Sequence, residues 1–214
     1  PPGGGALLRL DRIDVTGGDA RISGVRVRVA TDVRSTLCGP GGAARMFAAQ
    51  KGAAPEEIEL LERALRRFAE IAARDLGVDV LALEGGGAAG GLAAGLAAGL
   101  GATIEPGFRL VAEMLQLERL IAACDIVITG EGRLDAQTSF GKAPQGVAEI
   151  ARRQGRRAVM LAGSVDASYD VKAGPFDVIE SCALPGMSAQ QAMRDARRLL
   201  RDAACRALER LAGH

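Results

Sequence analysis

Apolar and polar positions follow two different periods along this chain, and each period predicts a different kind of element. Residues 25–31 (VRVRVAT) alternate strictly, which is typical of a half-buried strand. Residues 55–76 repeat apolar side chains every three or four positions, which is typical of an amphipathic helix. Pro55 suits the first turn of that helix, and Gly77 suits its end.

The rest of the pattern falls into an irregular part and a regular part. Before residue 124 it predicts a short helix over 42–50, a strand over 78–83, a Gly/Ala-rich helix within 85–102, and a helix over 108–124 that breaks near Gln116. From residue 125 it predicts strands at 125–129, 157–163 and 176–182, a helix at 143–154 ended by Gly155, and a closing helix at 188–213 with Ser188 as its N-cap. The second order is typical of a parallel α/β sheet, so we place a domain boundary near residue 120.

Composition and charge exclude several classes of protein. The chain has 214 residues, a formal net charge of +1, 3% aromatic residues and no Trp. No charged field attracts nucleic acid or an anionic membrane over the whole surface, and base-stacking platforms have little to be built from. We therefore expect neither a nucleic acid nor a membrane as a partner. The only histidine is His214, so a Ser-His-Asp triad or a histidine-ligated zinc site cannot be built within this chain.

The cysteines and the first residues indicate the context in which the chain works. The four cysteines are far apart and none forms a CxxC pair, which favours free thiols in a cytoplasmic protein. The opening PPGGGALLRL has no basic and apolar pattern of a signal peptide, and it looks like the middle of a longer chain.

A glycine-rich stretch at 85–90 (GGGAAG) matches the G-x-G-x-x-G pattern of dinucleotide-binding loops after a predicted strand. A nicotinamide-dependent oxidoreductase is therefore one alternative, although the acidic residue expected about 20 positions on, at the end of a second strand, is missing. The apolar run is also shorter than the roughly 20 residues of a membrane span. The plainer interpretation is a helix packed closely on a neighbouring element, with an N-terminus that offers amides to an anion.

Residues 130–142 (GEGRLDAQTSFGK) carry the densest candidate chemistry. They follow the predicted strand 125–129, and ligands of an open parallel sheet bind at the carboxyl ends of its strands. Glu131 and Asp135 can hold magnesium or accept a proton, and Arg133 can grip a carboxylate or phosphate. Lys142 precedes a predicted helix N-terminus, which favours anions. The segment is not a Walker A loop, because Ala143 stands where that motif has Ser or Thr.

These segments together resemble a known family. CDIVITGEGRLDAQTSFGKAPQGVAEIAR (124–152) closely resembles the signature of bacterial glycerate kinases of the type that forms 2-phosphoglycerate. ATDVRSTLCGPGGAARMFAAQKGA (30–53), the Gly/Ala-rich stretch 84–107 and VMLAGSV (159–165) are similar to further segments of that family, in the same order.

The resemblance implies a two-domain α/β kinase of which this chain holds the C-terminal part. Residues 1–120 correspond to the latter part of a mixed α/β middle domain, and 121–214 to the returning half of a flavodoxin-like domain with a parallel sheet, both incomplete. The family implies ATP and Mg²⁺ as cofactors and D-glycerate as substrate. The N-terminal part of the family's length is missing here, so we expect an inactive fragment whose exposed sheet edge favours self-association.

Roles for individual residues follow as hypotheses from this resemblance and from general phosphoryl-transfer chemistry. Asp32, Glu131 and Asp135 are candidates for accepting the substrate proton and holding magnesium, with Glu131 and Asp135 as metal ligands. Arg133 is the candidate for the substrate carboxylate. The candidates for holding the ATP phosphates are Lys142, Lys51, Gly130, Gly132, Gln137, Thr138 and Gly141.

The chain departs from the family pattern in the Asp32 loop. Ser35 and Thr36 stand where the family usually has Asn-Pro, and Ala49 stands where it usually has Pro. Loss of a proline frees the backbone, which affects the geometry of that loop. Besides the oxidoreductase, two alternatives stay open: a truncated module that only mediates interactions, and a kinase for another small hydroxy acid.

Overall fold

The computed structural model describes residues 3–135, 143–171 and 173–213. The chain divides into two compact units, Pro1–Gly107 and Phe108–His214. The boundary near residue 120 that we drew from the order of predicted elements stays a prediction.

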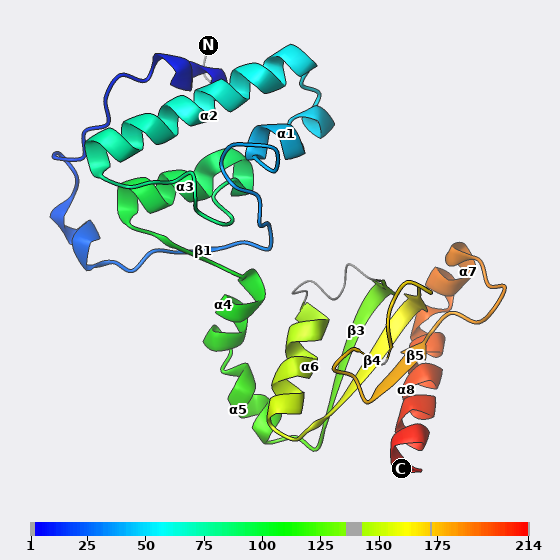
Figure 1. Cartoon of the computed structure of the whole chain (residues 1–214). Helices are drawn as coiled ribbons and strands as arrows, with labels where there is room; N and C mark the ends of the chain where they lie inside the picture. Colours follow the sequence, from blue (N-terminus) through cyan, green and yellow to red (C-terminus); the bar gives the residue numbers. More distant parts are fainter. Residues whose placement is uncertain (1–2, 136–142, 172, 214) are drawn as a thin grey trace. The chain divides into compact units, whose positions relative to one another are not determined.

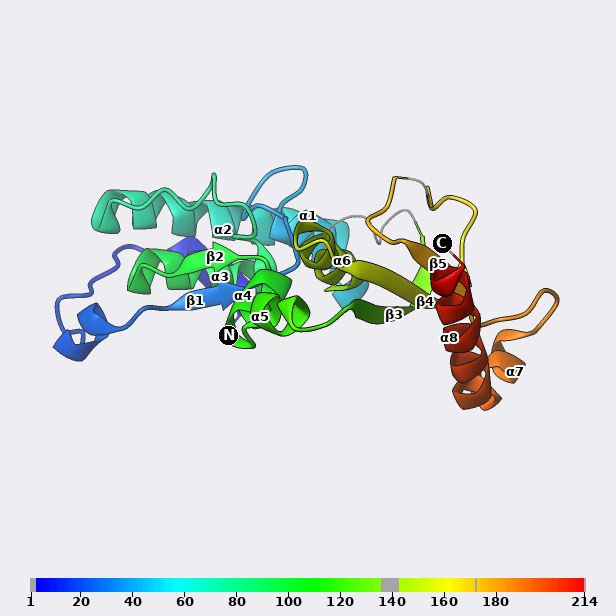
Figure 2. The ribbon, with the colours of Figure 1, turned by 90° about the horizontal axis from the view of Figure 1, so that it is seen from below.

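The first unit is built in layers. Its longest helix, α2 (Pro55–Leu76), packs against α3 (Ala88–Leu100), and α3 lies against a parallel pair of short strands, β1 (Arg28–Ala30) and β2 (Thr103–Glu105). Figure 2 shows α2 and β1 on opposite sides of α3. The smaller elements are the 3-10 helices η1 (Gly4–Arg9), η2 (Ala20–Gly24) and η3 (Ala49–Lys51) and the short helix α1 (Ala43–Phe47).

Local signals explain helix α2. Pro55 stands at its start, the Glu57 carboxylate accepts a hydrogen bond from the Ala54 N–H at 2.8 Å, and Gly77 ends it with a left-handed φ of 69°. Its buried face, which includes Leu65 and Ala72, joins the core of the first unit. The structure confirms the predicted helix. It was predictable because its end signals and its apolar spacing indicate the same boundaries.

Of two strands predicted for the first unit, one is absent and the other is shorter than predicted. Residues 78–83 form no strand, and the alternating segment 25–31 contributes only Arg28–Ala30 to the sheet. Because no strand precedes GGGAAG, the structural context of a dinucleotide-binding loop is lacking there. The glycines serve close packing instead, since a Cβ on Gly87 would lie 2.3 Å from the Thr36 carbonyl oxygen.

The second unit is a three-stranded parallel sheet in the order β3-β4-β5 with helices around it. Figure 1 shows α6 next to β3 and α8 next to β5. The elements are α4 (Gly107–Met114), α5 (Leu117–Ala122), β3 (Ile126–Leu134), α6 (Ala143–Arg153), β4 (Arg157–Val165), β5 (Val178–Ser181), α7 (Ala189–Arg194) and α8 (Ala196–Ala212).

The two faces of this sheet are covered differently. Ala158 and Met160 of β4 lie in the core that α6 covers, whereas Val159 and Leu161 lie in the core that α8 covers. On β3 the register places Ile128 opposite Val159, on the α8 face, yet its side chain is 49% exposed. Helix α8 therefore covers β4 and β5 and leaves the same face of β3 open.

Several other predictions are confirmed. The α/β class with parallel strands is present in both units. The helix over 108–124 does break at Gln116, whose φ is 52°, and the Ser188 side chain accepts from the Gln191 N–H as an N-cap. All four cysteines are free thiols. Within residues 3–135, 143–171 and 173–213, no helix combines the length and apolar character needed to cross a membrane.

Candidate active site

The polar segment after residue 129 begins as a strand, not as a loop. Strand β3 continues to Leu134, and Glu131 and Arg133 pair in register with Ala162 and Ser164 of β4. The predicted end at residue 129 was therefore wrong. The glycines that indicated a loop are accommodated because the neighbouring strand β4 supplies the backbone partners.

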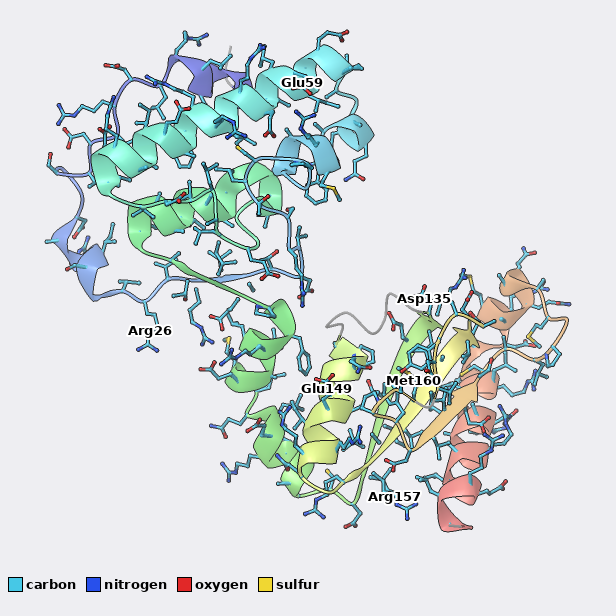
Figure 3. All side chains as sticks on the ribbon, in the orientation of Figure 1. Arg26, Glu59, Asp135, Glu149, Arg157 and Met160 are labelled. Carbon is cyan, nitrogen blue, oxygen red and sulfur yellow. The ribbon has the colours of Figure 1, made fainter. Side chains whose placement is uncertain are left out.

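The extended strand sorts the candidate residues onto two faces. Ala162 faces the α6 core, so its register partner Glu131 lies on the α6 face, and Arg133 shares that face because side chains alternate along a strand. Gly130 pairs with Leu161 and lies on the α8 face. Figure 3 shows Asp135 at one end of β3 and Arg157 at the opposite end of the sheet, where β4 begins. The acidic and basic candidates thus gather at the carboxyl end of β3.

Arg133 lies between two carboxylates. Its guanidinium donates a hydrogen bond to Asp166, the residue that follows β4, and its Nε lies 4.0 Å from Oδ2 of Asp135. Hydrogen bonds from Ser168 lower the pKa of Asp166 to about 2, and the Arg133 cation adds to the effect. Asp166 therefore stays ionised throughout the neutral range and keeps its attraction for Arg133.

The backbones of β3 and β4 approach closely at this end of the sheet. A Cβ on Gly163 would lie 2.3 Å from the Gly132 carbonyl oxygen, and one on Gly130 would lie 3.0 Å from the Leu161 carbonyl oxygen. Glycine at 163 is therefore required by the space between the strands, which fixes where Glu131 and Arg133 project.

A groove of about 740 Å³ opens on the α8 face of the same strand ends. Gly130, Gly132 and Gly163 form its floor, and Met187, Met193 and Leu200 are among its apolar walls. Gly130 in the floor of the groove lies on the same face of β3 as Ile128, two positions away along the strand.

Two candidate residues belong to the first unit. Asp32 follows β1, and its Oδ1 accepts a hydrogen bond from the Gly107 N–H at 3.1 Å. Lys51 ends the 3-10 helix η3 and is exposed. The structure thus gives Asp32 a structural contact at the carboxyl ends of β1 and β2, where Thr31 also bonds to the Glu105 carbonyl.

Four further candidates, Gln137, Thr138, Gly141 and Lys142, lie outside the described residues. The description resumes at Ala143, where α6 begins. A helix of this length presents unpaired amides and a partial positive charge at its N-terminus, which favours an anion there.

The carboxylates at the end of β3 are of the type that magnesium prefers, but they are few. Magnesium usually binds one or two carboxylates and takes its other ligands from water and phosphate. The described part of the chain contains no cluster of three or more Asp, Glu, His or Cys side chains that could hold an ion. Glu131 and Asp135 are four positions apart at the end of an extended strand, roughly 13 Å between Cα atoms, so one of the two carboxylates would hold the ion, with phosphate and water completing the shell.

Asp166 was missed by the sequence analysis. It stands directly after β4, whose residues 158–162 are buried, and an acidic residue close to the end of a predicted parallel strand was the available signal. Its pairing with Arg133 depends on β3 and β4 being neighbours, which the residue pattern alone did not establish.

Comparisons with known proteins agree over nearly the whole chain. The model of the glycerate kinase family matches residues 1–212. A glycerate kinase of Halalkalibacterium halodurans is 42% identical over 203 residues, which is 94% of this chain and 53% of that protein. Glycerate 2-kinase of Escherichia coli is 40% identical over 163 residues, 76% of this chain and 43% of that protein. The chain thus spans about half the length of the curated relatives it matches.

A solved structure matches in three dimensions. A crystal structure described as that of a glycerate kinase 2 from Salmonella typhimurium LT2 superposes with a TM-score of 0.80 at 42% sequence identity. The match covers 99% of this chain and 55% of that one.

Proposed function

The chain belongs to the glycerate kinase family, and from this premise we propose that the full-length protein phosphorylates D-glycerate with ATP. The observation that carries the proposal is the gathering of Glu131, Arg133 and Asp135 at the carboxyl end of β3. Phosphoryl transfer depends mainly on positioning and on neutralising charge, and these side chains provide both signs of charge in one place.

Each residue at this strand end has a proposed task. Arg133 binds the carboxylate of glycerate, because a guanidinium can give that group two parallel hydrogen bonds. Asp135 and Glu131 are the carboxylates proposed to hold a magnesium ion, which would supply positive charge against the ATP phosphates, and the one not engaged by the ion would accept the proton of the attacking hydroxyl. Asp32 remains the alternative acceptor of that proton from the first unit.

The phosphates of ATP are assigned to cations and amides. Lys142 and the amides at the start of α6 neutralise the transferred group, together with the backbone of Gly130 and Gly132. Gln137, Thr138 and Gly141 are further candidates for hydrogen bonds to the phosphates, and Lys51 is a further phosphate ligand.

We also propose that the open face of β3 is covered in the full-length protein by the part of the family's length that this chain does not span. Parallel sheets are normally covered on both faces, and Ile128 is half-exposed here. On this view residues 121–214 are half of a flavodoxin-like domain, and residues 1–120 belong to the middle domain. The 214-residue chain alone would then be inactive and would self-associate in sizing experiments.

The decisive experiment incubates the full-length gene product with ATP, Mg²⁺ and D-glycerate and follows the product by ³¹P NMR. We expect 2-phosphoglycerate, and its resonance is distinct from that of 3-phosphoglycerate. Tartronate and D-lactate serve as competing small hydroxy acids. Absence of glycerate-dependent ATP consumption would refute the proposal, and faster turnover of another acid would change the substrate.

Free thiols agree with a cytoplasmic location for the enzyme.

A further inference from the structure

Asp166 is fixed more firmly than an ordinary loop residue. Its backbone N–H donates to the Leu134 carbonyl at 2.8 Å, which ties it to the end of β3. Its Oδ1 accepts from the Ser168 N–H at 2.9 Å, and its carbonyl accepts from the Tyr169 N–H at 3.1 Å. The carboxylate is therefore set in place by the backbone around it before it meets Arg133.

Arg133 is the more exposed partner of this pair. Its side chain is 64% exposed, compared with 30% for Asp166 and 28% for Asp135. A long exposed arginine samples many rotamers, so a rigid acceptor restricts it. The hydrogen bond to Asp166 uses one terminal nitrogen of Arg133, and a guanidinium has five N–H donors, so other donors can still bind a carboxylate.

The two carboxylates around Arg133 have different tasks if Asp135 holds magnesium. A carboxylate that turns toward a cation gives up part of its attraction for a neighbouring arginine. Asp166 has its own backbone anchors and keeps Arg133 in place when Asp135 engages the ion. The arrangement separates the metal ligand from the arginine anchor.

We propose that Asp166 is a positioning residue that holds the Arg133 guanidinium ready for the carboxylate of the substrate. This inference rests on the proposed function of Arg133. Asp166 touches neither substrate nor metal in this scheme and acts only through Arg133. Its loss should therefore weaken binding of the carboxylate and leave the chemical step largely intact.

The first test compares Asp166→Asn with the wild-type full-length protein in steady-state kinetics. We expect KM for glycerate to rise roughly five- to tenfold while kcat changes by less than about twofold, the pattern of lost uniform binding. Asp166→Glu should recover part of the affinity. Asp177→Asn is the structural control, because Asp177 accepts from the Ala158 N–H at 2.7 Å near the opposite end of the sheet. It should lower thermal stability without changing KM.

A second measurement does not depend on activity. The Arg133 Nε–H resonance, identified by its loss in Arg133→Lys, should shift in Asp166→Asn while the resonances of other arginines stay in place. If wild-type protein does not phosphorylate glycerate, the proposed function fails and this spectrum still tests the positioning. An unchanged Arg133 resonance, an unchanged KM, or a fall in kcat at constant KM would overturn the role of Asp166.

Discussion

Each of the two units buries one carboxylate among the described residues, and the two carboxylates stabilise different things. In the first unit Glu62 accepts from the Gly39 N–H at 2.7 Å, which holds a backbone turn, and it pairs with Arg66 of its own helix at 3.4 Å. In the second unit Glu180 of β5 forms ion pairs with Arg206 at 3.0 Å and Arg210 at 2.9 Å. The first unit uses its charge to shape a loop, whereas the second uses it to fasten α8 to the sheet.

The same contrast applies to the candidate site. In the first unit a carboxylate oxygen of Asp32 accepts a hydrogen bond from the Gly107 backbone N–H. In the second unit Arg133 and Asp135 interact through their side chains. Side-chain pairs at the end of a sheet can exchange partners when a ligand arrives, whereas a backbone contact mainly fixes a turn. We therefore assign most of the chemistry to the second unit.

The largest expected effect tests the close approach of β3 and β4. Gly163→Ala should cost about 3 kcal/mol of unfolding free energy, because its Cβ would meet the Gly132 carbonyl oxygen at 2.3 Å. Gly95→Ala in α3 is the matched control, since a Cβ there has no neighbour within 4 Å. The control should stabilise by up to about 1 kcal/mol. Urea unfolding of both variants decides the point, and equal effects would contradict the close approach.

The next effect concerns activity and the division of labour between the units. Asp135→Asn in the full-length protein should lower kcat roughly 100-fold, the scale of losing one key charge at a transition state. Thermal unfolding should remain close to wild type. A loss of less than about threefold would remove Asp135 from the catalytic residues.

Asp32→Asn sharpens this comparison. If Asp32 mainly accepts from the Gly107 N–H, the asparagine oxygen can replace it and kcat should change much less than in Asp135→Asn. An equal loss of kcat in the two variants would show that the first unit carries as much of the chemistry as the second.

A smaller effect separates the two buried carboxylates. Glu180→Gln should cost about 2 kcal/mol, because hydrogen bonds to charged groups are the stronger ones. Glu62→Gln should cost about 1 kcal/mol, because its amide oxygen can still accept from Gly39. Raising the salt concentration should reduce the cost of Glu180→Gln more than that of Glu62→Gln, since Glu180 pairs with two arginines and Glu62 with Arg66 alone. Equal costs and equal salt responses would contradict the distinction.

The smallest expected effect appears in acid. Hydrogen bonds from Arg74 and from the Ile13 N–H lower the pKa of Asp75 to about 2, and the pKa of Asp166 is lowered to about 2 mainly by Ser168. A folded-state pKa below the unfolded value contributes stability above about pH 4, and that contribution is lost as the pH falls toward 2. Melting temperatures between pH 6 and pH 2.5 should therefore fall less steeply in Asp75→Asn and Asp166→Asn. Slopes equal to wild type would contradict this assignment.

Local chemistry explains which elements the sequence could predict. The ends of α2, the break at Gln116 and the Ser188 cap depend on residues within a few positions of each other, so their signals were readable. The polar and glycine residues of 130–142 marked that segment as a candidate site. The resemblance then added the family and hypothetical roles for its residues.

Tertiary pairing explains what the sequence could not predict. Gly130 and Gly132 indicated a loop, but pairing with β4 keeps β3 extended to Leu134. The strand predicted over 78–83 does not form, although Val80 and Leu81 still contribute to the core. Asp166 reaches Arg133 only because two strands separated by a helix become neighbours.

The contact between Gly163 and the Gly132 carbonyl also has a genetic consequence. Every amino acid other than glycine carries a Cβ, so every missense change of codon 163 introduces the same obstruction between the strands. A deep mutational scan should show this position uniformly depleted, whatever the chemistry of the new side chain. Gly155, two residues after α6, has a φ of 66° but no atom within 4 Å of its Cβ position, so there the scan should report only backbone strain.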